Sequence, residues 1–477
     1  MSARARLWFP HTTHAAAAAH DKEVVNDMAR SSTGLSRRAF LAAGLGAATV
    51  PLLAGCSSGT GTTVAAGLFG TKLPTSTLIY WNLFGGGDGT RMQAMEAGYE
   101  KQYGANSLQA TTFAWGNPYY TKVTLATVGN KPPDVAVSHL TRAKPLWDGG
   151  LLEPITDDDL ASVGLSASDF SQRPWNEQRT DGQNICVPLD THPLVMFYND
   201  DVCRKAGLMD SSGTLKKLNN LDEFESALAA ISKVTKGPAM TIANVAGETA
   251  TPWRVFWTFY NQHSQATPFL SDNGSKLTVN EDVFNDVTTR LQSWVKKGWV
   301  NSGLDYATAE SYMFTGKAGL YLEGEWEITT AQSVKGLKFG IVPVPTLYDK
   351  AATQADSHTF VLPRKDRTPE QRKQAMLFIR SMLDQSLTWA KGGHIPAYQP
   401  VARSAAYKTL KPQSDYASVA SSAVYDDPAW YGGSGSTFEN IVGAQLGLVQ
   451  QLTLSPQEAL QAIKSQLSVY LNTPSPL

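Results

Sequence analysis

Thr77-Leu78-Ile79-Tyr80-Trp81 and the glycine-rich run Gly85-Gly86-Gly87-Asp88-Gly89 open the part of the chain that decides its fold. The first run is rich in β-branched and aromatic residues and predicts a short strand, which the glycine-rich run closes as a turn. Arg91 to Tyr103 follows with apolar residues at helical spacing. A strand followed by a helix, repeated along the chain, predicts βαβ units and a parallel or mixed sheet.

This alternation continues to the end of the chain. Further strand patterns lie at 108–113, 133–137, 185–188, 194–198, 319–322 and 339–342. Helix patterns lie at 119–128, 221–232, 281–297, 369–384, 436–452 and 455–471. Ser455, with Pro456 and Glu458 behind it, supplies the cap, the proline and the acidic first turn that are typical of a helix start. The predicted fold class is therefore α/β.

The N-terminal region carries an export signal. Ser36-Arg37-Arg38-Ala39-Phe40-Leu41 has the twin-arginine pattern, and the apolar run 39–55 is shorter than the about 20 residues that a membrane span needs. Small residues before Cys56 match a bacterial lipobox. We therefore expect residues 1–55 to be cleaved and the Cys56 thiol to carry lipid; an ordinary cleaved signal with an incidental cysteine is the alternative.

The rest of the chain is expected to form two lobes on a tether. Residues 57–76 are mostly small and polar and predict a flexible tether. Removing 55 of 477 residues leaves 422, more than one core comfortably serves. Met28 lies at a conventional distance before the arginine pair, so translation starts either there or at Met1.

Composition narrows the class of partner. A net charge of −1 and a charged fraction of 17% argue against nucleic acid. The chain has 12 Trp, and aromatics on an extracellular protein suit the stacking of sugars. Cys186 and Cys203 would remain after lipidation, and a disulfide between them stays an open alternative.

Several phrases resemble one family. Phe197-Tyr198-Asn199-Asp200-Asp201-Val202, with Ala206-Gly207-Leu208 after it, is the first of them. The others are Leu221-Asp222-Glu223-Phe224, Phe314 to Leu320 with Gly324-Glu325-Trp326, Phe339 to Pro345, and Gly392 to Ala397. In this order they resemble family 1 extracellular solute-binding proteins, the capture components of ABC importers related to maltose-binding protein. One glycine of the third phrase is shifted by one place from the family pattern.

The resemblance implies a periplasmic-binding-protein-like fold with two α/β lobes and a ligand cleft between them. Hinge crossovers are then expected near 190–194, 356–360 and 393–400. Residues 77–190 plus 358–393 would form the N-terminal lobe, and residues 194–356 plus 400–477 the C-terminal lobe.

The resemblance also implies a function. The protein would be a monomeric, non-catalytic lipoprotein without a cofactor at the extracellular face of the membrane. It would capture a sugar or oligosaccharide and deliver it to an ABC permease. The sequence leaves open the identity, length and linkage of the sugar, and an iron, polyamine or peptide ligand. A secreted lipid-anchored glycoside hydrolase with an Asp/Glu pair is the alternative from another class.

Candidate ligand-binding residues are flat aromatics and hydrogen-bonding side chains, which match the apolar faces and hydroxyls of a sugar. They lie in loops after strands, at the expected crossovers, or in the family phrases. The candidates are Asp88, Trp115, His139, Asp190, His192, Trp253, Glu325, Trp326, His358, Tyr398 and Trp430. Helix capping is the alternative for Asp88 and His139, and core packing is the alternative for Trp253.

Metal chemistry is not expected from local spacing. The 8 His are scattered, and the sequence contains neither His-Glu-x-x-His nor Cys-x-x-Cys. His192 has no second histidine within a few residues to make a local ligand pair.

Overall fold

A computed structural model describes residues 77–476. Arg37, Arg38, Cys56, the tether at 57–76 and both candidate start residues lie outside the described residues, so the export, lipidation and start-site predictions stay predictions. Between residues 77 and 476, no helix is both long and apolar enough to cross a membrane.

The first sheet has six strands and is built around β1 (Leu78–Asn82). β1 pairs in parallel with β2 (Leu108–Thr112) and with β3 (Val135–His139). β15 (His358–Pro363) then runs antiparallel to β3 and also pairs with two short strands, β4 (Leu152–Glu153) and β7 (Val187–Pro188).

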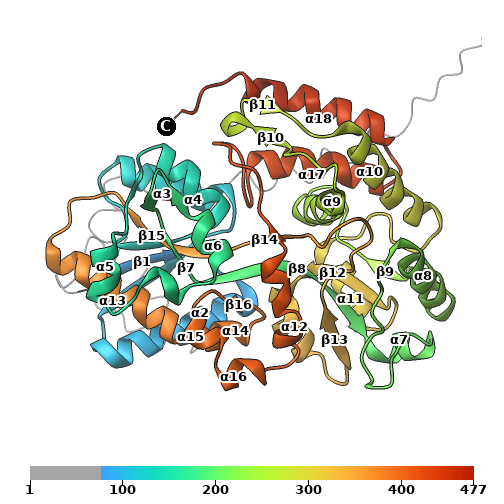
Figure 1. The fold of residues 1–477 in the computed structure, drawn as a ribbon, viewed down its shortest axis with the longest axis horizontal. Helices are drawn as coiled ribbons and strands as arrows, with labels where there is room; N and C mark the ends of the chain where they lie inside the picture. The colour runs from blue at the N-terminus through green and yellow to red at the C-terminus, as the bar shows by residue number, and fades with distance from the viewer. Residues whose placement is uncertain (1–76, 477) are drawn as a thin grey trace, which may run out of the picture. The chain divides into compact units, whose positions relative to one another are not determined.

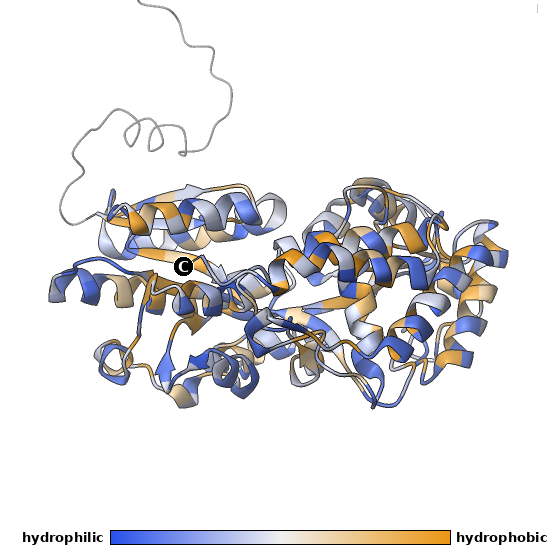
Figure 2. Cartoon of the chain, turned by 90° about the horizontal axis from the view of Figure 1, so that it is seen from above, coloured by the Kyte–Doolittle hydropathy of each residue, from blue (hydrophilic) through white to orange (hydrophobic). Residues whose placement is uncertain are grey.

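Helices cover this sheet and enclose a core of its own (Figure 1). They are α2 (Gly86–Tyr103), α3 (Asn117–Val128), α4 (Leu140–Asp148), α5 (Asp157–Ser162), α6 (Gln172–Glu177), α13 (Pro369–Asp384) and α14 (Ser386–Ala390). Hydrophilic and hydrophobic residues alternate along such helices (Figure 2), as expected where one face packs on a sheet and the other meets water.

The second sheet has seven strands around β8 (Asp190–Asn199), all ten of whose residues are buried. β8 pairs with β12 (Leu320–Gly324), β13 (Phe339–Val342), β14 (Thr353–Asp356) and β16 (Ile395–Pro396). β9 (Met240–Thr241) and β17 (Ala423–Val424) complete the sheet.

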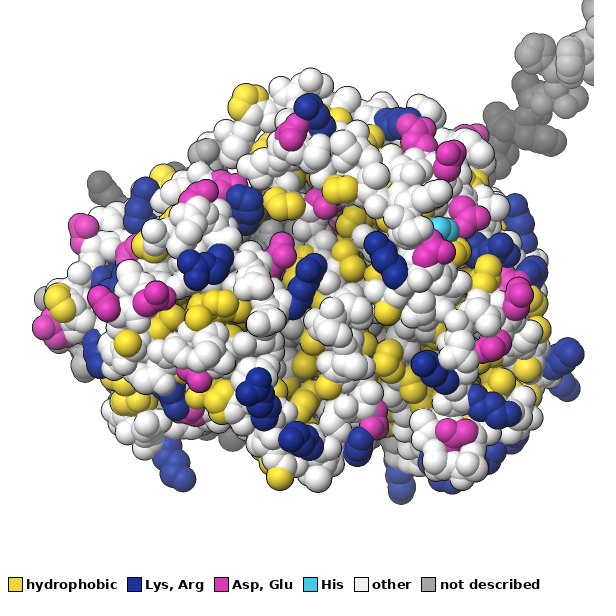
Figure 3. Space-filling model, in the orientation of Figure 1, with side chains coloured by type: hydrophobic (Ala, Val, Ile, Leu, Met, Phe, Trp, Pro, Cys, Tyr) yellow, Lys and Arg dark blue, Asp and Glu magenta, His cyan; other side chains and the backbone are white. Residues whose placement is uncertain are grey.

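Helices also enclose the core of the second sheet. The principal ones are α8 (Leu221–Thr235), α9 (Ala250–Gln262), α10 (Glu281–Lys296), α11 (Tyr306–Phe314), α12 (Ile328–Ser333), α17 (Thr437–Gln450) and α18 (Pro456–Leu471). Basic and acidic side chains are interspersed over the face drawn in Figure 3, so neither sign of charge dominates it.

The chain passes from one sheet to the other between β7 and β8, between β14 and β15, and again between β15 and β16. Ser357 alone separates β14 of the second sheet from β15 of the first. The Ser357 hydroxyl donates to the Asp190 carbonyl at 2.6 Å, and the Leu189 N–H donates to the His358 carbonyl at 2.8 Å. The α/β fold class with two sheets and crossovers is thus confirmed, while the lobe boundaries stay a prediction.

The glycine-rich run differs from its prediction as a turn, because it forms the first turn of α2, which begins at Gly86. A Cβ at Gly87 would lie 2.8 Å from Thr329 Cβ, and one at Gly89 would lie 2.9 Å from the Phe84 carbonyl oxygen. The glycines therefore permit close packing of the helix start, which a rule based on turn propensity does not anticipate.

Two further boundaries differ. β8 begins at Asp190, four residues before the predicted start at Leu194. His139 is the last residue of β3 and does not lie in the loop beyond it.

The two cysteines are free and buried, Cys186 in the core of the first sheet and Cys203 in that of the second. They make no disulfide in this structure. The helix start at Ser455 is confirmed, because its side chain and that of Glu458 form reciprocal capping bonds.

Gly443→Ala is expected to lower the free energy of unfolding by about 2–3 kcal/mol. Gly443 faces the start of α9 so closely that a Cβ would lie 1.9 Å from the Thr249 carbonyl oxygen. Gly447, one turn later on α17, has no atom nearer than 3.7 Å to such a Cβ. Gly447→Ala should therefore be neutral or stabilise by up to about 1 kcal/mol. Urea unfolding of both variants tests this, and equal effects would contradict the close packing.

Candidate functional site

A cavity of about 310 Å³ lies where elements of both sheets meet. The start of α2, the end of β3 and the start of β15 contribute from the first sheet, while β8, α9 and α11 contribute from the second. Its principal lining side chains are Phe84, Asp88, Trp115, His139, His192, Thr251, Arg254, Tyr306, Trp326 and His358.

Six predicted site residues line this cavity: Asp88, Trp115, His139, His192, Trp326 and His358. They come from sequence positions as far apart as 88 and 358, and the fold brings them to one cavity. Neither Asp88 nor His139 serves as a side-chain helix cap, since the caps of α2 and α4 carry no side-chain hydrogen bond. Asp190 and Glu325 are fully buried and do not line the cavity.

Three predicted site residues lie elsewhere. Trp253 is buried in the second core, where its ring stacks on that of Trp257 at 4.9 Å and its Nε1–H donates to Asp426 at 3.0 Å. Tyr398 is buried near Phe170, with ring centroids 6.1 Å apart. Trp430 donates from Nε1 to the Thr473 carbonyl at 3.2 Å. The structure does not bring these three side chains to the cavity.

Two indoles and one guanidinium shape the cavity wall. Trp115 is 41% exposed, whereas Trp326 is held by a bond from its Nε1–H to the Tyr306 hydroxyl at 2.9 Å. The Arg254 Cζ lies 4.9 Å from the Trp326 ring and 5.9 Å from the Trp115 ring. The wall thus combines flat apolar faces with a cationic hydrogen-bond donor.

Arg254 is held by buried carboxylates. Its Nη1 lies 3.5 Å from Glu323 Oε1, and the Thr251 hydroxyl donates to Glu323 Oε2 at 2.5 Å. Burial disfavours the charge of Arg254, but Glu439 and Glu323 outweigh it and raise its pKa above the ordinary value. The guanidinium therefore stays charged inside the cavity wall.

Glu439, in the first turn of α17, is the second of these carboxylates, and its stability contribution should depend on pH. Burial raises its pKa from the ordinary 4.5 to about 7. The folded protein then binds a proton that the unfolded chain releases, so stability from this group is complete below pH 4.5 and is lost as the pH rises to 7. The free energy of unfolding of wild type minus that of Glu439→Gln should fall by about 3 kcal/mol across this range.

Denaturant unfolding at several pH values between 4 and 8 measures this difference. A difference that stays constant with pH would contradict the assigned pKa of Glu439.

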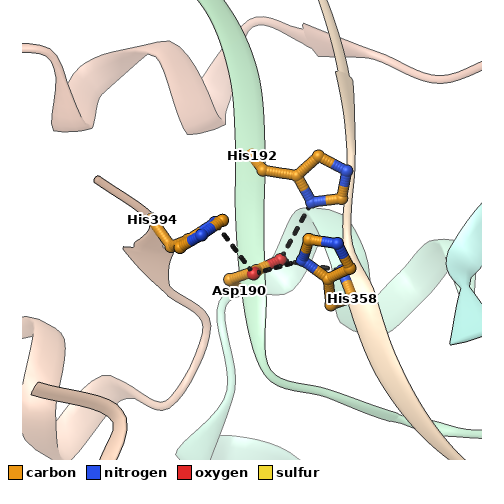
Figure 4. Close-up of side chains that lie close together, drawn as sticks. All are labelled: Asp190, His192, His358 and His394. Atoms are coloured by element: carbon orange, nitrogen blue, oxygen red, sulfur yellow. Dashed lines mark hydrogen bonds and ion pairs between the residues drawn. The ribbon is translucent and has the colours of Figure 1, made fainter. Parts of the chain in front are cut away.

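Below the cavity, three imidazoles surround one carboxylate (Figure 4). Asp190 accepts from His192 Nδ1 at 3.2 Å and from His358 Nδ1 at 2.8 Å, and its Oδ2 lies 3.3 Å from His394 Nδ1. The Trp389 Nε1–H and the His358 backbone N–H donate to it as well, at 2.6 and 2.7 Å. Burial opposes the charge of Asp190, but His358 and His192 outweigh it and hold its pKa well below the ordinary value.

The imidazoles reach from this carboxylate into the cavity. The rings of His192 and His358 stack 4.0 Å apart, and both line the cavity with His139. Burial lowers the pKa of His192 to about 3, so its ring is neutral. A neutral imidazole offers one donor and one acceptor, which suits a hydroxyl-bearing ligand.

Sequence reasoning missed Arg254, Tyr306, Thr251 and His394. Arg254 follows Trp253 on α9, and a helix turns by about 100° per residue, so neighbours face different surroundings. The stacking argument selects aromatic residues such as Trp253 and gives no weight to the adjacent arginine. The available signal was that Arg254 is the single charged residue of α9 and stands among aromatic and apolar residues.

The profile of the bacterial extracellular solute-binding proteins matches residues 94–413, more than half of the chain. The chain belongs to this family. The resemblance found in its sequence phrases is thereby confirmed. The curated relative of this solute-binding protein is also named as a binding protein.

One curated relative is named for the solute that it binds. The maltodextrin-binding protein MdxE of Bacillus subtilis is 22% identical over 227 residues, which are 45% of this chain and 48% of MdxE. The solute-binding protein thus matches about half the length of that relative.

Solved structures share the fold. The GacH receptor of Streptomyces glaucescens, described unliganded and with acarbose, has a TM-score of 0.67 at 16% identity and covers 83% of this chain and 98% of its own. UgpB of Mycobacterium tuberculosis, in complex with glycerophosphocholine, has a TM-score of 0.68 at 16% identity and covers 84% and 99%. These matches establish a two-lobe fold of the maltose-binding-protein kind for this solute-binding protein.

Proposed function

We propose that this protein captures a sugar or oligosaccharide in the cavity between its two sheets. The observation that carries the proposal is the pair of indoles, Trp115 and Trp326, with Arg254 beside both rings. Indoles cover the apolar faces of a pyranose, and the guanidinium and neutral imidazoles bind its hydroxyls. A relative named for maltodextrin and a structural neighbour described in complex with acarbose support the same ligand class.

Capture works through closure of two lobes about the crossovers. Residues 77–190 plus 358–393 form one lobe and residues 194–356 plus 400–477 the other. Ligand that contacts Trp115 on one side and Trp326 on the other stabilises the closed state by contacts absent from the open state. The equilibrium shifts only by that difference in affinity.

Binding without catalysis fits the carboxylates of the cavity. A glycosidase needs one carboxylic acid to give a proton and a second carboxylate to act as base or nucleophile. Asp88 Oδ1 lies 3.0 Å from His394 Nε2, and Glu248 accepts from the Tyr306 N–H at 3.2 Å. Each of these two lining carboxylates has a protein partner, and the family match, more than these contacts, favours binding over the glycoside hydrolase alternative.

The proposed function also includes a lipid anchor at the cell surface and delivery of the solute to a permease. Lipid on Cys56 holds the monomer at the extracellular face of the membrane, and the tether at 57–76 lets it meet an ABC permease. Cys56→Ser is expected to release the protein into the medium; retention on the membrane would overturn the lipid anchor.

Calorimetry and tryptophan fluorescence test the ligand class. Titration with maltotriose, maltopentaose and mannobiose, with glycerophosphocholine as a non-sugar comparison, should give one glycan site per chain with quenched fluorescence and no hydrolysis product. X-ray scattering should record compaction on binding. Hydrolysis of a glycan, or binding of glycerophosphocholine alone, would overturn the proposal.

A further inference from the structure

Four side chains below the cavity converge on one point from three parts of the fold. Asp190 and His192 stand two residues apart on β8, so they share a face of that strand. His358 opens β15, and His394 comes from the turn before β16. One ligand atom of each lies within 4.8 Å of the others, and all four residues are buried.

We propose that Asp190, His192, His358 and His394 bind a first-row divalent transition-metal ion, with Zn²⁺ as the best fit. The ion would be a resident part of the cavity floor and not the transported solute. This site goes beyond the proposed capture of a sugar, and it shares His192 and His358 with the cavity lining while adding Asp190 and His394.

Several buried polar atoms at this point make ion-pair contacts but no hydrogen bond. His394 Nδ1 and both carboxylate oxygens of Glu325 are buried without a hydrogen-bond partner, although Nδ1 lies 3.1 Å from Glu325 Oε1 and 3.3 Å from Asp190 Oδ2. Buried polar atoms in native proteins nearly always have a partner, and an orphaned group points to a missing water or ion. A cation beside His394 Nδ1 would satisfy that nitrogen and the carboxylates around it.

The outer contacts of His394 have the arrangement of a metal ligand. Its Nε2 lies 3.0 Å from Asp88 Oδ1, while its Nδ1 faces the cluster. A histidine that binds a metal through one nitrogen commonly donates from the other to a carboxylate, which fixes the tautomer and the ring orientation. His192 and His358 both form part of the cavity lining.

Spacing and donor type select the class of ion. A divalent ion with bonds of about 2.1 Å holds neighbouring ligands about 3.0–3.4 Å apart in octahedral or tetrahedral geometry. Asp190 Oδ2 lies 2.8 Å from His358 Nδ1 and 3.3 Å from His394 Nδ1, while its Oδ1 lies 3.2 Å from His192 Nδ1. An ion that enters here would take the place of the protons in these contacts, with small shifts of the side chains. Three imidazoles and one carboxylate suit Zn²⁺ or its first-row neighbours, whereas Mg²⁺ and Ca²⁺ prefer oxygen ligands.

Metal content and the spectrum of a Co²⁺ derivative test the site directly. The protein is the full chain made without an affinity tag, with His11→Gln, His14→Gln and His20→Gln as background because these residues also offer imidazoles. After chelator treatment and reloading with one equivalent of Zn²⁺ or Co²⁺, we expect about one ion per chain after desalting, visible Co²⁺ absorption bands and a raised melting temperature. Mg²⁺ and Ca²⁺ should not be retained.

Variants then assign the ligands. His394→Gln and His358→Gln should each weaken Zn²⁺ binding at least tenfold, whereas His263→Gln, at a histidine that faces Asp286 outside the cluster, should bind as the background protein does. Should a cluster variant fail to fold, the Co²⁺ spectrum of the background protein decides alone. Retention below about 0.1 ion per chain with no Co²⁺ bands, or an equal loss in His263→Gln, would overturn the proposal. Glycan binding is measured separately, so either proposal can fail alone.

Discussion

Arg254→Met is expected to lower the free energy of unfolding by about 3–5 kcal/mol at pH 8 and to weaken glycan binding as well. The change leaves Glu323 and Glu439 buried in the cavity wall without the cation that both face. Removing one partner of a buried ion pair strands the other charge in a medium that solvates it poorly. Urea unfolding measures the loss, which should shrink at pH 5.5 because burial raises the pKa of Glu439 to about 7 and this carboxyl group then takes up a proton.

Two companion variants isolate the charge from the shape of the side chain. Arg254→Lys keeps a cation and should lose less stability than the methionine variant. Glu323→Gln added to Arg254→Met removes one stranded carboxylate and should recover part of the loss. A loss below about 1 kcal/mol in Arg254→Met would contradict the role of the arginine.

Trp326→Ala is expected to weaken glycan binding about 100-fold, and this result rests on the proposed function. A buried aromatic anchor at the centre of a binding site commonly contributes about 2–4 kcal/mol on truncation. The Trp326 ring is fixed for this role, because its Nε1–H bonds to Tyr306 and it lies over Gly324, where a Cβ would sit 2.0 Å from the indole. Calorimetry with the tightest glycan of the panel measures the change.

Trp430→Ala is the matched control for this prediction. Trp430 was a candidate from sequence, but it packs near Tyr470, with ring centroids 5.8 Å apart, away from the cavity. Its loss should leave glycan affinity unchanged, while Trp326→Phe should keep part of the affinity. Equal losses in the two alanine variants would place the ligand elsewhere.

Local signals predicted the regular elements well. α13 occupies residues 369–384 as expected, because Thr368 and Pro369 start it by side-chain capping and a preset φ. β13 likewise matches its prediction at 339–342. Such elements are specified by residues within a few positions of each other.

Features that depend on residues far away in the sequence could not be predicted from local patterns. The first four residues of β8, Asp190-Thr191-His192-Pro193, are polar or proline and do not look like a buried strand. They are buried because β14, β16 and the histidines at 358 and 394 surround them. His192 lies 166 residues before His358, and His358 lies 36 residues before His394, so they have no local metal spacing and their convergence could not be predicted.

The two buried thiols make this chain suited to optical measurement. Burial raises the pKa of Cys186 and Cys203 to about 12, so hardly any thiolate exists at neutral pH and alkylating dyes will not react there. With Cys56 replaced by serine, cysteines introduced at the exposed positions Leu125 on α3 and Val469 on α18 would be the reactive ones. A donor and an acceptor fluorophore at these positions would turn the protein into a sensor that reports its solute by energy transfer.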